Sequence, residues 1–120
     1  MSRAPAGPKR ARARPRRPRL ALAIFWTDRA LRDLEAIRDF IARDNIPAAD
    51  RWVARLIAAA AQAATAPLAA RQVPEIGRSD VRELLLRNYR IVYRVSGDHI
   101  DVLTVFEGHR LFPTDVEPTG

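Results

Sequence analysis

The stretch VRELLLRNYRIVYRVSGDHIDVLTVF, from Val81 to Phe106, decides the fold, because its apolar residues recur at the period of a β-strand. The pattern predicts strands over Val81–Leu86, Tyr89–Val95 and Ile100–Phe106. Only Arg-Asn separates the first two strands, and only Ser-Gly-Asp-His separates the last two. Such short links join antiparallel neighbours. The three strands are therefore expected to form an antiparallel meander.

The middle strand has two chemically different faces, because successive side chains of a strand point to opposite sides. One face holds Tyr89, Ile91, Tyr93 and Val95, and the other holds Arg90, Val92 and Arg94. A sheet needs an apolar face against which helices can pack. We therefore expect helices on the tyrosine and isoleucine side, with Arg90 and Arg94 on an open face.

Two helices are predicted before the meander. Thr27 is a favourable N-cap for a helix that runs to about Arg43, and Asn45 with Pro47 begins a second helix that runs to about Thr65. Apolar residues follow at the three-and-four spacing of a buried stripe. The expected stripe holds Ala30, Leu31, Leu34, Ile37 and Ile41 in the first helix, and Ala49, Val53, Leu56, Ile57, Ala60 and Ala64 in the second. The short link between them predicts a helix hairpin.

The remaining segments complete an α+β fold. Leu20–Trp26 is an apolar run typical of a short buried strand, which should join the sheet at a position that the sequence leaves open. Residues 66–79 contain two prolines and a glycine and are predicted to be a loop. The expected order is a short N-terminal strand, an antiparallel helix hairpin and a three-stranded antiparallel meander, with the helices packed on one face of the sheet.

Charge divides the chain into a basic tail and a nearly neutral body. The full chain has 21 basic and 14 acidic residues, but residues 1–19 hold eight of the basic residues, four prolines and no acid. We expect a disordered tail over 1–19, one folded domain over 20–113 and a C-terminal tail over 114–120. The first tail either contacts nucleic acid nonspecifically through its charge or is a solvated extension.

Several kinds of chemistry are excluded or disfavoured by composition. The chain has no cysteine and only two histidines, so neither a thiolate zinc site nor a histidine metal cluster is expected. No phosphate-binding glycine loop or nucleophile elbow occurs either. We therefore expect no metal and no cofactor. The apolar run before Thr27 is too short to span a membrane, and a cytoplasmic protein is expected.

Arginines of the second half are the candidate binding residues. They are Arg82, Arg87, Arg90, Arg94 and Arg110. Guanidinium groups on a strand face can hold phosphates or carboxylates through paired hydrogen bonds, although arginines alternating on an uncovered sheet face can also be simple solvation. His109, next to Arg110, is the candidate proton-transfer group, or else a structural histidine at a strand end.

Four strings, in this order, resemble the RelE/ParE toxin superfamily of bacterial type II toxin-antitoxin systems. They are FWTDRALRDLEAIRDFI from Phe25, RQVPEIGRSDVREL from Arg71, NYRIVYRV from Asn88 and FEGHRLFP from Phe106. The resemblance spans Phe25 to Phe112. It implies a compact toxin that an antitoxin neutralises by wrapping it with an extended or helical segment.

The resemblance implies two possible activities. One branch of the superfamily cuts messenger RNA on the ribosome with basic residues of the sheet and a tyrosine or histidine near the C-terminus; the ParE branch inhibits DNA gyrase without that catalytic set. Arg82, Arg90 and Arg110 match basic positions of the superfamily. The chain departs from the nuclease pattern at Glu83, which follows Arg82, and at Phe112, where the C-terminal tyrosine is absent.

Three functions remain open from the sequence, and a gyrase-binding toxin is preferred because the body after the tail is nearly neutral. A nuclease that holds RNA should have a basic body. The second is a ribosome-dependent messenger RNA endonuclease that uses Arg82, Arg90 and Arg110 for phosphate and His109 for proton transfer. The third is a non-toxic adaptor or degenerate relative whose arginine face only binds an acidic partner.

Overall fold

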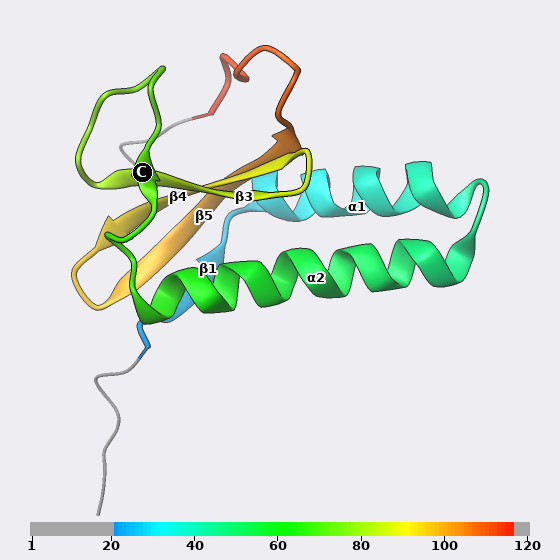
Figure 1. The fold of residues 1–120 in the computed structure, drawn as a ribbon, viewed down its shortest axis with the longest axis horizontal. Helices are drawn as coiled ribbons and strands as arrows, with labels where there is room; N and C mark the ends of the chain where they lie inside the picture. The colour runs from blue at the N-terminus through cyan, green and yellow to red at the C-terminus, as the bar shows by residue number, and fades with distance from the viewer. Residues whose placement is uncertain (1–20, 117–120) are drawn as a thin grey trace, which may run out of the picture.

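The computed structural model describes residues 21–116 and confirms the α+β class, the helix hairpin and the antiparallel meander (Figure 1). Its elements are β1 (Ala23–Trp26), α1 (Asp28–Ala42), α2 (Ile46–Thr65), β2 (Arg71–Gln72), β3 (Val81–Leu86), β4 (Tyr89–Ser96) and β5 (His99–Glu107). The predicted tail over 1–19, with its possible nucleic-acid contact, lies outside the described residues, as does the end of the predicted tail over 114–120.

Both helices begin at the predicted caps. The Thr27 hydroxyl accepts a hydrogen bond from the Ala30 N–H at 3.1 Å, and the Asn45 side-chain oxygen accepts one from the Ala48 N–H at 2.9 Å. Each cap satisfies one of the backbone donors that a helix leaves unpaired in its first turn. The Thr27 hydroxyl also donates to the Val102 carbonyl at 2.8 Å, which fixes the start of α1 to β5.

The sheet has five strands in the order β1-β5-β4-β3-β2. The first strand does join it, next to the last one and parallel to it, with Ile24 opposite Ile100. The sheet is therefore mixed. The predicted loop over 66–79 is wrong at Arg71–Gln72, because these two residues form β2 and pair antiparallel with Glu83 and Arg82 of β3. A two-residue strand is too short to produce a readable alternation.

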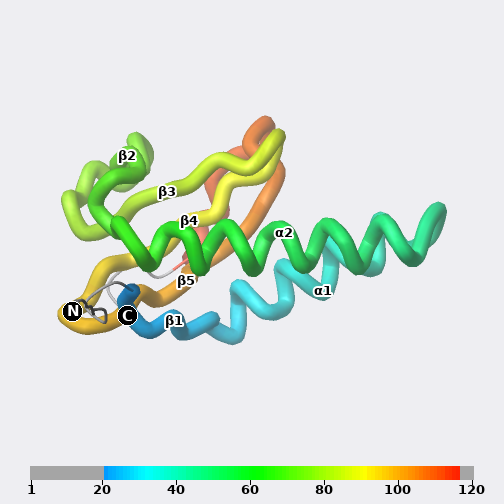
Figure 2. Tube along the Cα trace, turned by 60° about the horizontal axis from the view of Figure 1, so that its bottom comes forward, coloured from blue at the N-terminus to red at the C-terminus, as the bar shows by residue number. Residues whose placement is uncertain are grey.

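The helix hairpin covers one face of the sheet, as predicted (Figure 2). Leu34 of α1 and Leu56 of α2 are buried there against Ile91 of β4. Two members of the predicted stripes are exposed, Leu31 at 48% and Ile57 at 46%. Residues at the margin of a helical stripe turn away when the helix contacts the sheet along a narrower line.

The opposite face of the sheet carries a second core, so the expectation that this face is open is wrong. Its buried residues are Val73, Val81, Val92, Leu103 and Phe106, and Ile76, Phe112 and Val116 pack against them. Residues 73–76 lie in the loop before β3, and residues 112–116 lie beyond β5. Two irregular segments from distant parts of the chain thus cover the side that the helices leave free.

The helix hairpin extends past the sheet at the end where α1 meets α2 (Figure 1). Where β1 ends, α1 continues along β5. The Asp33 carboxylate of α1 accepts hydrogen bonds from the Val105 N–H at 3.0 Å and the Thr104 hydroxyl at 2.5 Å. This contact satisfies backbone that has no strand partner there and positions the outer half of α1 above the end of β5.

Candidate functional site

The five candidate arginines do not form one surface. Arg82 lies opposite Tyr93 in the register of β3 and β4, and Tyr93 is buried on the helix side. Arg90 and Arg94 lie on the other face, as predicted. Arg87 occupies the turn between β3 and β4, and Arg110 follows β5. The alternation of β-strand side chains places neighbouring candidates on opposite sides of the sheet.

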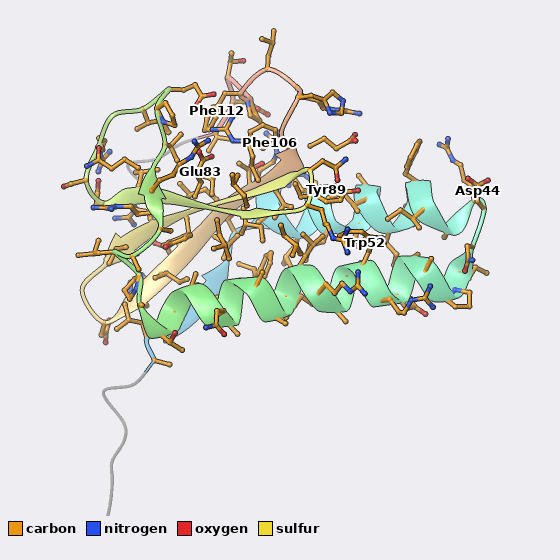
Figure 3. The ribbon with its side chains drawn as sticks, in the orientation of Figure 1. Asp44, Trp52, Glu83, Tyr89, Phe106 and Phe112 are labelled. Carbon is orange, nitrogen blue, oxygen red and sulfur yellow. The ribbon has the colours of Figure 1, made fainter. Side chains whose placement is uncertain are left out.

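Arg90 is buried and forms ion pairs with buried Glu83 and with exposed Glu75. Figure 3 labels Glu83, Phe106 and Phe112, which lie around this side chain. Its Nε donates to Glu83 at 2.6 Å, and its two terminal nitrogens donate to the Glu75 carboxylate at 2.9 and 2.8 Å. The guanidinium also lies 5.1 Å from the ring centre of Phe106 and 5.6 Å from that of Phe112. Hydrogen bonds and both aromatic faces therefore engage this side chain within the chain itself.

The exposure expected for Arg90 is therefore wrong, since only 7% of the residue is exposed. The covering segments supply Glu75 from the loop and Phe112 from beyond β5. Glu83 is 1% exposed and also accepts a hydrogen bond from Arg71 at 2.5 Å, so both buried charges are paired. A buried, paired guanidinium is a structural group and does not present a free anion site.

Acid should weaken the fold through Glu75. The hydrogen bonds from Arg90 lower the pKa of Glu75 from 4.5 to about 2, against the opposing effect of burial. Between these two pKa values the unfolded chain binds a proton that the folded chain does not, so stability is lost as pH falls from about 4.5 to about 2. Urea unfolding at a series of pH values measures this slope.

The Glu75→Gln variant is the matched control, because it keeps the size of the side chain and one acceptor oxygen for Arg90 while it removes the titrating group. Its free energy of unfolding should depend less on pH than that of the original chain in the same window. Hydrogen bonds from Arg78 and Arg29 also lower the pKa values of Asp80 and Asp115, and these groups remain in both proteins. Equal slopes for the two proteins would contradict the proposed role of Glu75.

Arg82 and Arg94 are also engaged internally. Arg82 donates to the carbonyls of Ser79, Leu68 and Ala70 at 2.8, 3.1 and 2.9 Å, and so fastens the chain before β3. Arg94 donates to Asp101 of β5 at 2.8 Å, and its side chain is 18% exposed. Contacts within the chain hold both side chains, and Arg94 Nε is buried without a hydrogen-bond partner.

The remaining candidates are exposed to solvent. Arg87 is exposed in its turn, and Arg110 is exposed with its Nε 3.6 Å from Glu107. His109 is exposed beside it. A nuclease site would require the imidazole and the guanidinium groups to converge on one phosphate. In the structure His109 is exposed, whereas the donors of buried Arg90 are occupied by Glu75 and Glu83.

An open cleft of about 700 Å³ lies between the outer half of α1 and the segment after β5. Its apolar lining includes Ile37 and Phe40 from α1, Tyr89 and Val105 from the sheet, and Leu111 from beyond it. Phe40 is 66% exposed and Leu111 is 93% exposed, so both side chains leave apolar surface of the cleft in contact with water. Charges of both signs, Arg43, Arg110, Asp39 and Glu107, complete the lining.

Aromatic and cationic groups continue near the cleft. The rings of Trp52 and Tyr89 lie 5.6 Å apart and come from α2 and β4, as Figure 3 shows. Arg55 lies 5.4 Å from the Trp52 ring, and Arg43 lies 5.6 Å from the Phe40 ring. Burial raises the pKa of Tyr89, so its hydroxyl stays protonated at neutral pH. Aromatic side chains and arginine are typical of protein interfaces.

The sequence analysis missed this cleft. Phe40 falls on the flank of the predicted stripe of α1, and Leu111 stands alone beyond the last strand. The sequence did contain one signal of this cleft, because both side chains are large and apolar at positions where the pattern predicted no core. Between residues 21 and 116, no cluster of histidine, aspartate and glutamate could hold a metal ion, and no helix has the length and apolarity needed to cross a membrane.

Comparison with known proteins identifies the family. The model of the family described as "ParE toxin of type II toxin-antitoxin system, parDE" matches residues 24–112. The chain belongs to the ParE toxin family. This ParE-type chain is 41% identical over 96 residues to "Putative toxin Y4kP" of Sinorhizobium fredii, an alignment that covers 75% of the chain and 92% of that relative. The predicted toxin class and its ParE branch are thereby confirmed.

A solved structure shows the same fold as this ParE-family chain. It is described as "Chromosomal ParDE TA system from P. aeruginosa" and superposes with a TM-score of 0.61 at 22% identity. The match covers 72% of this chain and 96% of that one. The protein is thus a ParE-type toxin of a type II toxin-antitoxin system.

Proposed function

We propose that this ParE-type toxin inhibits DNA gyrase in the cytoplasm by protein contact and is neutralised by a cognate antitoxin. The observation that carries the proposal is the burial of Arg90. This residue matches a basic position of the superfamily, but its donors are occupied by Glu75 and Glu83. A group that cannot approach a phosphate supports action by binding over action by RNA cleavage.

The endonuclease alternative is disfavoured at two further positions. Phe112 stands where the superfamily's nucleases have a C-terminal tyrosine, and its ring packs against Phe106 at 5.5 Å between centres. A phenyl ring cannot transfer a proton. Tyr93 cannot replace the missing tyrosine, because it is buried and donates to the Pro67 carbonyl at 2.6 Å. A ribosomal cleavage assay should show no cut transcript, with or without His109→Ala.

The cleft beside α1 is our candidate docking surface for the antitoxin. Its apolar floor and its mixed charges fit a segment that has apolar residues on one side and both acidic and basic residues on the other. Arg43 and Arg110 would meet the acidic groups, and Asp39 and Glu107 the basic ones. Because the cleft is open and lined by exposed Phe40 and Leu111, its occupation would also remove apolar surface from water.

The decisive experiment is gyrase supercoiling with the purified chain. We expect inhibition that rises with toxin concentration and disappears when the antitoxin encoded next to it is added in equal amount. Gyrase that stays active at saturating toxin, together with intact transcripts and normal growth on expression, would favour the non-toxic adaptor instead. Cut transcripts with active gyrase would establish the endonuclease.

The variant Phe40→Asp tests the cleft. This change should weaken antitoxin binding by tenfold or more, or about 1.4 kcal/mol, because the apolar contact of the ring is lost and binding must desolvate a carboxylate. Leu68→Asp is the matched control, since Leu68 is 58% exposed and lies outside the cleft. Titration calorimetry should find unchanged binding for the control. Equal losses in both variants would remove the cleft as the docking surface.

A further inference from the structure

β1 leaves one edge of the sheet without a strand partner among residues 21–116. Its sequence, Ala-Ile-Phe-Trp, contains no charge and no proline. Charged residues and proline are among the features with which proteins prevent edge strands from pairing with other chains, and β1 has neither. Phe25 is 56% exposed on this strand, and Figure 2 shows β1 at the margin of the molecule.

The backbone groups of β1 that face outwards can be assigned from alternation. The Ala23 N–H donates to the Asp98 carbonyl at 3.2 Å, and the Thr27 N–H donates to the Val102 carbonyl at 3.1 Å, so these residues face β5. The residues between them at even positions, Ile24 and Trp26, therefore present N–H and C=O groups to the outside. Two donors and two acceptors stand on this edge.

The available edge is limited at both ends. The Leu22 N–H already donates to the Ala64 carbonyl at the end of α2, at 3.0 Å. After Trp26 the chain turns into α1, which begins at Asp28. Only the backbone N–H and C=O groups of Ile24 and Trp26 remain available to a second strand, so the pairing is limited to this short length.

We propose that β1 pairs antiparallel with β1 of a second copy of this chain. A strand that pairs with itself must place residues of the same face opposite each other. Ile24 then lies opposite Trp26 of the second copy, and Phe25 lies opposite Phe25 of the second copy. This register satisfies all four outward groups of each strand. Registers shifted by two residues would require Leu22 or Asp28, whose backbone is already engaged.

A second copy also suits the side chains of this edge. The chain from residue 20 onwards is nearly neutral, with 13 basic and 14 acidic groups, so repulsion between two copies comes chiefly from the eight basic residues of 1–19, and added salt should favour the dimer. The exposed Phe25 ring, which contacts the His99 ring edge-on at 5.0 Å between centres, would gain an aromatic cross-strand neighbour. A four-residue strand pair is a small interface, and we expect weak, concentration-dependent dimers.

The two-fold axis of this dimer runs perpendicular to the sheet. Both helix hairpins then lie on the same side of one continuous sheet. Phe40, Leu111 and the rest of the cleft are not part of β1, so the cleft of each copy keeps its own lining. The dimer is thus independent of the proposed antitoxin contact.

Cysteine trapping tests the register, because the natural chain has no cysteine. In Phe25→Cys the two new thiols would lie at a non-hydrogen-bonded pair, where Cα atoms are about 4.5 Å apart and a disulfide can form. In Ala23→Cys the two thiols would be offset by four residues, or about 13 Å, which no disulfide spans. Under mild oxidation, the Phe25→Cys chain should become mostly covalent dimer and the Ala23→Cys chain should remain monomer.

Sedimentation of the cysteine-free chain completes the test. The original chain should show a dimer at high concentration, and Phe25→Lys should abolish it, because two like charges would face each other. Leu68→Lys is the control, because Leu68 is 58% exposed and Phe25 is 56% exposed, and this variant should leave the dimer intact. Monomer at all concentrations, or equal cross-linking of both cysteine variants, would overturn the proposal. Protection of Cys in Phe25→Cys by antitoxin, with no dimer of the free chain, would assign the edge to an antitoxin strand.

Discussion

Replacing Arg90 by alanine is expected to lower the free energy of unfolding by about 3–5 kcal/mol, the cost typical of breaking a buried ion pair. The variant leaves Glu83, which is 1% exposed, with Arg71 as its remaining cationic partner. It also removes the guanidinium between the rings of Phe106 and Phe112. Urea unfolding monitored by circular dichroism measures the change.

Arg38→Ala is the matched control for the Arg90 variant. Arg38 pairs with Asp50 at 3.1 Å on the surface, and both side chains are largely exposed. Such a pair is worth only about 0–1 kcal/mol. The double variant Glu83→Met, Arg90→Met should recover much of the stability, since no buried charge is left unpaired. A loss below about 1 kcal/mol for Arg90→Ala would contradict a structural role for this network.

Leu56→Ala is the second variant expected to have a large effect, with a loss of about 2–5 kcal/mol. Leu56 is fully buried between α2 and the sheet, where it belongs to the same core cluster as Ile91 and Leu34. Truncation removes apolar contact and leaves a cavity that a rigid sheet cannot collapse to fill. Thermal and urea unfolding should both report the loss.

The neighbouring residue provides the control for this core variant. Ile57 is 46% exposed, although the helical pattern placed it in the same stripe as Leu56. Ile57→Ala should therefore cost markedly less than Leu56→Ala, because the side chain is already partly in water. Similar losses for the two variants would mean that α2 is rotated about its axis relative to the structure described above.

The Arg90 network also shows why a matching residue does not establish a matching chemistry. Arg90 occupies a position that the superfamily resemblance assigns to phosphate contact, but Glu75 and Glu83 use its hydrogen-bond donors. The loop before β3 and the segment after β5 cover this face of the sheet. Arg90, a candidate binding residue, therefore holds these two irregular segments to the sheet. The proposed antitoxin contact is therefore assigned to the exposed cleft and not to this face.

Sequence patterns predicted the elements because the signals are local. Thr27 and Asn45 cap the helices through contacts with residues three positions ahead. The alternation along β4 predicted that Ile91 and Tyr93 face the helices, and both are buried there. The position of β1 beside β5 could not be read in the same way, because strand pairing across the whole chain leaves no periodic signal.

The candidate site was predicted less well than the fold. Arg82, Arg90 and Arg94 were correctly located on their strands, but their partners come from other segments: carbonyls near residue 70, Glu75 and Asp101. The alternation along a strand indicates on which face of the sheet a side chain lies, but it does not indicate which segments cover that face. The cleft beside Phe40 is likewise formed by segments distant in the sequence, namely α1, the sheet and the chain after β5.

The amino-acid sequence by itself determined the helices, the meander and the toxin family, since caps, turns and alternation act between residues close in the chain. Only the tertiary structure decided which arginines are free. Burial of a charge depends on what residues distant in sequence place over it, and here an aperiodic loop and the segment after β5 cover Arg90 with Glu75 and Phe112. Such long-range cover has no local pattern from which it could be foreseen.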